Sequence, residues 1–119
     1  MTSETPSWYR PRGYRHLDRP ISISAATDLV TSPERVAHHA FWPFLGYEKS
    51  TPRYKPDIHK VKAKSRPIAY ASHVDSLIYS YYCERISALY EAQLATRGLQ
   101  QVVLAYRRFP GGKSNIHFA

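Results

Sequence analysis

A run of apolar residues at three- and four-residue steps, between Ser72 and Gly98, limits most strongly how this chain can fold. Its members are Val74, Leu77, Ile78, Tyr81, Tyr82, Ile86, Leu89, Tyr90 and Leu94. This period is that of an amphipathic α-helix. Ser72 and Asp75 resemble a capping box with Asp in place of Glu. Gly98, just after Arg97, is typical of a helix end. The pattern therefore predicts one long helix over about 72–97.

A shorter helix is expected to begin near Ser32, where Pro33 suits the first helical position. Pro43 and Gly46 should end it. Before it, Ile21–Ile23 reads as a short alternating run. Four apolar residues at its end should pack as core: Phe41, Trp42, Phe44 and Leu45.

Lysines alternate at Lys60, Lys62 and Lys64, and Arg66 follows two residues later. On an extended strand alternate side chains share one face. Such a face repels itself unless a polyanion lies opposite, and a nucleic-acid backbone or a nucleotide triphosphate would be that polyanion.

The residues around these lysines predict a β-hairpin of Ile58–Ala63 with Arg66–Ala71, turning near Lys64-Ser65. Its register decides whether the arginine shares the lysine face. Pro67 places its strand at an edge. Lys49–Lys55 should be a basic loop, and the apolar run Val102–Tyr106 a buried strand.

The positive charge of the chain comes in blocks. The 119 residues carry a formal net charge of +8. Residues 49–66 hold seven basic side chains against one acid, Asp57, and residues 97–119 hold four against none. Each of the segments 20–48 and 67–96 has three acids against one base. Clustered cations are expected of a protein that contacts nucleic acid, although a solvated surface would explain them too.

Ten tyrosines are many for this length. Three occupy core positions of the long helix: Tyr81, Tyr82 and Tyr90. Packing is the better interpretation for those, whereas Tyr54, between Arg53 and Lys55, is a candidate for contact with nucleic acid.

Groups suited to catalysis are scarce. The nine acids are scattered and suggest no two-metal site. His38 and His39 are neighbours on a helix, so their side chains diverge, and we expect no metal site. Gly111–Ser114 lacks the first glycine of a phosphate loop and should be a turn.

The compartment follows from composition. Cys83 is the only cysteine, so no internal disulfide can form, and we expect it to be buried in the long helix. Residues 1–11 lack the apolar core of a signal peptide, and no run is long enough for a membrane span. We expect residues 1–11 to be disordered, although Trp8 and Tyr9 could dock, and the protein to be cytoplasmic.

The block 60–68 (KVKAKSRPI) resembles the basic strand of bacterial reverse transcriptases of the retron, group II intron and antiphage-defence kinds. The early Asp75 of the following helix, the Tyr90-Glu91 step and the Tyr106-Arg107 pair follow in the same order as in that family. The segment 12–18 (RGYRHLD) is similar to the opening of the antiphage-defence members.

The resemblance covers residues 12–119 and implies the fingers subdomain of an RNA-directed DNA polymerase, with antiviral defence among the family's roles. It implies that Arg66 and one lysine contact the triphosphate of the incoming dNTP. Lys60 and Lys62 are nearest to the family's spacing, Lys64 also competes, and the sequence does not choose. A surface ion pair of Arg66 with Asp57 or Asp75 is the plain alternative.

The family's catalytic Asp and its Tyr-x-Asp-Asp motif have no counterpart here. Polymerisation needs carboxylates that hold two metal ions. We therefore expect residues 12–119 to be an incomplete polymerase domain that is inactive alone. Its cofactor, Mg²⁺, would be held by the complete polymerase, and its partners would be dNTP, an RNA or DNA template-primer, and the missing palm and thumb.

The expected fold is α+β: a long amphipathic helix, one or two shorter helices and a small antiparallel hairpin. One alternative function is a self-contained small basic nucleic-acid-binding protein. Another is a protein-interaction module that docks through its tyrosine-rich helix.

Overall fold

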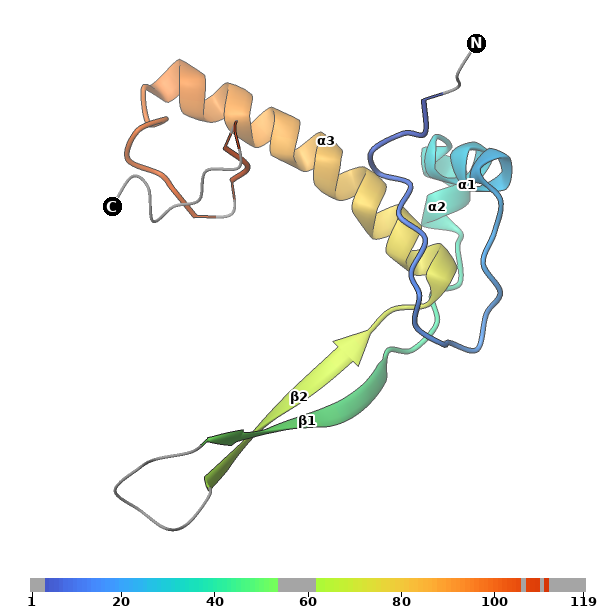
Figure 1. The fold of residues 1–119 in the computed structure, drawn as a ribbon. Coiled ribbons are helices and arrows are strands. Elements are labelled where there is room, and N and C mark those ends of the chain that lie inside the picture. The colour runs from blue at the N-terminus through green and yellow to red at the C-terminus, as the bar shows by residue number, and fades with distance from the viewer. Residues whose placement is uncertain (1–3, 54–61, 106, 110, 112–119) are drawn as a thin grey trace. The chain divides into compact units, whose positions relative to one another are not determined.

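The computed structural model describes residues 4–53, 62–105, 107–109 and 111. It has the expected α+β composition, with three helices and one antiparallel hairpin in these residues (Figure 1). The elements in chain order are α1 (Ile23–Val30), α2 (Pro33–Ala37), β1 (Leu45–Arg53), β2 (Lys62–Tyr70) and α3 (His73–Arg97). The chain forms two compact units, Met1–Ile78 and Tyr79–Ala119, and each is described by itself.

Two short helices precede the hairpin. α1 begins after Ser22, whose side chain accepts a hydrogen bond from the Ala25 amide, and it buries Ala26 and Val30. The alternating run at 21–23 therefore forms no strand, and its last residue, Ile23, begins α1. The sequence signal for α1 was present, because Ala26 and Val30 are four residues apart and lie on one helix face.

The start of α2 is confirmed, but its length is not. Ser32 is the N-cap and Pro33 the first helical residue, as expected. The helix ends at Ala37, well before Pro43, and the chain then leaves helical geometry at His38. The prediction that the aromatic cluster after this helix packs as core is wrong, because Phe41, Trp42 and Phe44 are each more than two-fifths exposed.

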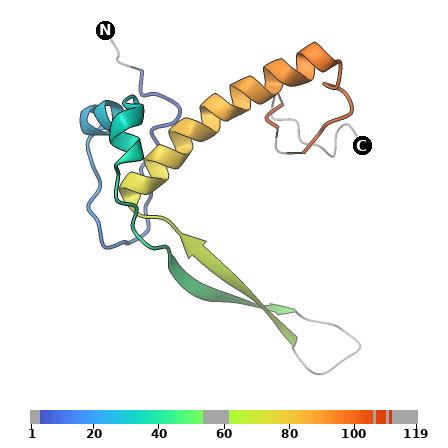
Figure 2. The same cartoon turned by 180° about the vertical axis from the view of Figure 1, so that it is seen from behind.

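The hairpin is where prediction and structure differ most. β1 and β2 run side by side as a two-stranded antiparallel ribbon (Figures 1 and 2). Lys64 and Ser65, expected at the turn, lie inside β2, and the expected loop from Lys49 is a strand as far as Arg53. Strand pairing is set by contacts distant in sequence, and the alternation of Lys62 to Arg66 did not identify residues 45–53 as the partner. The segment between the strands, residues 54–61, lies outside the described residues.

The N-terminal residues contribute to the small core of the first unit. Trp8 is 8% exposed, and the Tyr9 hydroxyl donates a hydrogen bond to the carbonyl of Ile21 at 2.9 Å. Both residues dock, as the sequence allowed. Leu77 and Ile78, from the first turns of α3, are also buried.

The long helix is confirmed to within a residue at both ends. Ser72 precedes α3, and its side-chain oxygen accepts from the Asp75 amide at 3.2 Å. At the other end Gly98 adopts φ 66°, a left-handed conformation that glycine tolerates, and the Leu99 amide donates to the carbonyl of Leu94. Local capping therefore fixes both limits.

In the second unit, several side chains expected to be buried in α3 are exposed: Cys83, Ile86, Leu89 and Tyr90. Leu94 is buried. Helical spacing predicts which residues share a face, but burial requires another element to cover that face, and α3 has little covering it in the part of the chain that is described.

The strand expected over 102–106 is absent from its described part, residues 102–105, and Tyr106 lies outside the described residues. Val102 is 70% exposed, and Val102 and Val103 donate backbone hydrogen bonds to the carbonyl of Leu99 in a turn. Arg107 fixes this turn to α3, since its Nε and NH2 groups donate to the two carboxylate oxygens of Glu91 at 2.7 and 2.8 Å. This hydrogen-bonded pair lowers the pKa of Glu91 and raises that of Arg107.

Candidate nucleic-acid interface

The register of β1 with β2 gathers cations on one face of the hairpin. Directly paired residues of antiparallel strands lie on the same face, and alternate residues share it. The pairs that carry the cations are Lys49 with Arg66, Thr51 with Lys64, and Arg53 with Lys62. We call the face that bears these five basic residues the cationic face. The side chains of Lys49, Lys64 and Arg66 are exposed.

The opposite face of the hairpin carries no basic residue along its paired length. Its members are Gly46, Glu48, Ser50 and Pro52 of β1, with Ala63, Ser65, Pro67 and Ala69 of β2. Glu48 is the acid of the paired strands, and its Oε2 accepts a hydrogen bond from the Ser65 hydroxyl at 3.1 Å. The strand geometry thus separates this carboxylate from the cations by the thickness of the sheet.

The described side chains of the cationic face have no acidic partner in the part of the chain that the structure describes. Among the residues that the structure describes, Lys49, Lys64 and Arg66 form no ion pair. Asp75, a candidate partner for Arg66, is 1% exposed and bonded elsewhere. Asp57, the other candidate, lies outside the described residues.

The register answers one question that the sequence left open, since Arg66 does share a face with Lys62 and Lys64. Lys60, Tyr54 and Lys55 lie outside the described residues. Arg53 and Lys62 are placed by their backbone alone, so the choice between Lys60 and Lys62 stays open.

Two residues of this face were missed by sequence reasoning. Lys49 was assigned to a loop, and Tyr47 was not considered. Both belong to the alternating set Leu45, Tyr47, Lys49, Thr51 and Arg53. That alternation is a strand signal, but Gly46 and Pro52 within the segment obscured it.

The end of the cationic face nearest α3 is aromatic. Tyr47 pairs with Ile68, and Leu45 pairs with Tyr70. The rings of Tyr47 and Tyr70 meet edge to face with centroids 6.1 Å apart, and Tyr14 packs on Tyr70 at 4.7 Å. An aromatic end therefore adjoins the row of cations.

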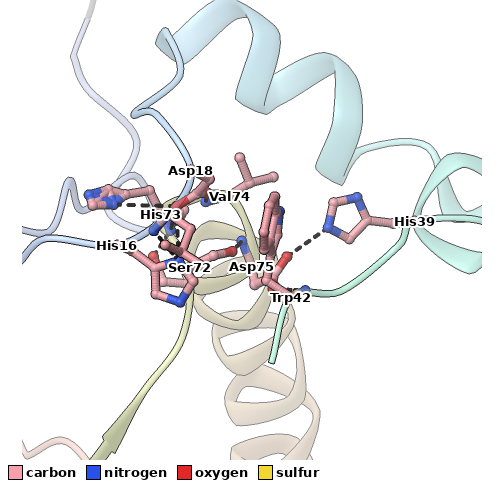
Figure 3. A network of polar contacts seen from close by, with 10 residues as sticks. His16, Asp18, His39, Trp42, Ser72, His73, Val74 and Asp75 are labelled. Carbon is pink, nitrogen blue, oxygen red and sulfur yellow. Dashed lines mark hydrogen bonds and ion pairs between the residues drawn. The ribbon is translucent and has the colours of Figure 1, made fainter. Parts of the chain in front are cut away.

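The first turn of α3 is held by Asp18, 55 residues earlier in the sequence (Figure 3). Its two carboxylate oxygens accept the backbone amides of His73 and Val74, each at 3.0 Å. Burial raises the pKa of Asp18, but the amides of Val74 and His73, with the imidazoles of His73 and His16 nearby, outweigh it and bring the pKa below 3.8. The carboxylate also complements the helix dipole.

Asp75 joins the same turn to the chain that enters the hairpin. Its Oδ1 lies 2.7 Å from Nε2 of His39, and its Oδ2 accepts the Trp42 amide at 2.9 Å (Figure 3). His39 thus has a protein partner in Asp75. In the described residues no three or more His, Cys, Asp and Glu side chains are grouped as a metal site would require.

Within the described residues, no helix combines the length and the apolarity needed to cross a membrane. No protein-family model matches the chain, and no curated protein matches its sequence.

Proposed function

We propose that this chain supplies the fingers part of an RNA-directed DNA polymerase of the reverse transcriptase kind. In this proposal the cationic face contacts the triphosphate of the incoming dNTP and the backbone of the template-primer. Arg66 would grip phosphate oxygens through its planar fork, and Lys62 or Lys64 would add a point charge. The proposal also assigns the chain to the cytoplasm and, through the resemblance, to antiviral defence.

The observation that carries the proposal is the gathering of five basic residues on one face of the hairpin. Three of them, Lys49, Lys64 and Arg66, form no ion pair with any residue that the structure describes. Like charges in neighbouring positions across two strands destabilise the hairpin. A bound polyanion would offset that cost, and phosphate oxygens satisfy Arg and Lys together. The resemblance to reverse transcriptases indicates which polyanion this would be: the dNTP triphosphate and the backbone of the template-primer.

The decisive experiment measures binding by the purified 119-residue chain. A fluorescent template-primer and each dNTP are titrated against the wild type and the double variant Lys64→Ala with Arg66→Ala. A matched double variant, Arg12→Ala with Arg19→Ala, removes the same charge from exposed positions outside the hairpin. Both ligands should bind the Lys64→Ala, Arg66→Ala variant more weakly, by tenfold or more. The slope of its log binding constant against log salt concentration should become shallower by the amount expected for about two lost phosphate contacts.

Equal losses in the two double variants would contradict the proposal, since a general effect of net charge would then explain the binding. The chain alone, with Mg²⁺ and dNTPs, should give no primer extension, because its acids offer no two-metal site. Extension by a clean preparation would refute the assignment as a non-catalytic part.

The net charge of +8 also favours a second function, a self-contained basic nucleic-acid-binding protein. The two differ in their ligands, because a self-contained binder has no need of dNTP. Binding of dNTP to the complex that already holds template-primer favours the polymerase part, whereas simple displacement of one polyanion by the other is expected of any basic surface. The genomic DNA downstream of codon 119 gives a second test, since the polymerase proposal requires an Asp-bearing strand and a Tyr-x-Asp-Asp motif there.

A further inference from the structure

Tyr47 adds an exposed aromatic ring to the cationic face. It lies on the cationic face, two residues from Lys49. Its side chain is 52% exposed although its ring contacts Tyr70. Tyr14 supports Tyr70 in turn, with centroids 4.7 Å apart. Tyr47 is therefore held in place by packed neighbours and still offers aromatic surface to solvent.

The face extends farther than one triphosphate. The pairs Tyr47–Ile68, Lys49–Arg66 and Thr51–Lys64 follow one another every two residues, which is about 7 Å, so the row from Tyr47 to Lys64 covers about 13 Å. The phosphorus atoms of a triphosphate are joined through single oxygens, whereas successive phosphates of a polynucleotide are separated by a sugar. A row of this length fits several backbone phosphates.

We propose that this face binds a single-stranded polynucleotide, with one base stacked on Tyr47 and the following phosphates lying over Lys49, Lys64 and Arg66. The inference rests on the proposed function, in which the cationic face binds phosphate, and it names Tyr47 and the unpaired strand in addition. Aromatic surface beside a cationic track is how proteins bind single strands without reading sequence. A duplex keeps its bases stacked inside and offers none to Tyr47.

The test compares two ligands that differ only in their bases. A fluorescent twelve-residue oligothymidine and an abasic oligomer with the same number of phosphates are titrated against the full chain. Tyr47→Ala should weaken binding of the oligothymidine about tenfold, because one stacked base is lost, and leave binding of the abasic oligomer unchanged. Tyr47→Phe should behave as the wild type. An oligouridine of the same length tests RNA, and the same tenfold loss is expected for it.

Tyr90→Ala is the matched control, since it removes an exposed tyrosine from the second unit and should change neither titration. No loss in Tyr47→Ala, or an equal loss on both ligands, overturns the inference. The proposed function is tested separately, because the double variant Lys64→Ala with Arg66→Ala should weaken binding of both ligands whether or not Tyr47 stacks on a base. Tighter binding of a twelve-base-pair duplex than of the single strand by the wild type would also overturn the inference.

Discussion

The cationic face of the hairpin and the first turn of α3 both collect charged residues, and the structure treats them in opposite ways. At the start of α3, Asp75 is buried, Asp18 is half-buried, and both accept backbone amides. On the hairpin, Lys64 and Arg66 are exposed, and among the described residues they form no ion pair. The carboxylates of Asp18 and Asp75 stabilise the fold, whereas the cations of the hairpin are free to bind a ligand from solution.

The physical reason for the contrast is the cost of leaving a buried charge or amide without a partner. A carboxylate in the interior must be hydrogen-bonded, so each of its contacts stabilises the fold. A cation on an exposed ribbon keeps its hydration, so it needs no partner until a polyanion arrives. Substitutions at the two places should therefore separate stability from binding.

The largest effect is expected for Asp18→Ala. Two partly buried amides of α3, those of His73 and Val74, lose a charged acceptor, and the free energy of unfolding should fall by about 3 kcal/mol. Urea denaturation followed by circular dichroism measures it. The control is Asp28→Ala, an exposed acid on α1, which should stay within about 0.5 kcal/mol of wild type. A similar fall in the free energy of unfolding in both variants would contradict the stabilising role given to Asp18.

Acid should reproduce part of that loss. The pKa of Asp18 in the folded protein lies below its ordinary value of 3.8, so its contribution is complete above about pH 4 and disappears as the pH falls through the lower, folded pKa. The stability difference between wild type and Asp18→Asn should therefore shrink below pH 4. Denaturation midpoints at several pH values from 7 to 2 measure it, and a constant difference would contradict the assignment.

A smaller effect is expected for His39→Ala. Asp75 would lose the contact at 2.7 Å but keep the amide of Trp42, so we expect a loss of about 1–2 kcal/mol. Exchange rates of the first amides of α3 would report the local loosening. His38 is the matched control, because its ring is exposed and contacts only the carbonyl of Glu34 by a hydrogen bond in the described structure. His38→Ala should cost less than His39→Ala.

The smallest effect on stability is expected for Lys64→Ala with Arg66→Ala, within about 0.5 kcal/mol of wild type or slightly stabilising, because repulsion on the cationic face is relieved. The same variant should show the large loss of binding described above. A fall of several kcal/mol in the free energy of unfolding, measured by urea denaturation, would show that these cations stabilise the fold, as the carboxylates at the start of α3 do.

Sequence reasoning succeeded where the deciding contacts are local. The limits of α3 follow from Ser72 and Gly98, which satisfy backbone groups within one helical turn. The start of α2 at Ser32 follows in the same way. α1 was missed although its cap, Ser22, is of the same kind, because a brief alternation at 21–23 was given more weight.

The same reasoning failed where a distant partner decides. Alternation identified Lys62 and Lys64 as one face and left Arg66 open, and the turn was wrongly placed inside β2. Burial of Cys83 and Tyr90 was wrong for a related reason, since helical period does not reveal whether anything covers a face.

The chain's own residues, read in order, determined the long helix, the spacing of the basic side chains and their excess over acids, because caps, periods and charge are properties of neighbouring residues. Only the tertiary structure paired β1 with β2, which brought Lys49 and Tyr47 beside Arg66. It also brought Asp18 to the amides of α3. Lys49 and Arg66 are 17 residues apart and Asp18 and His73 are 55 apart, so their pairing depends on how the whole unit packs.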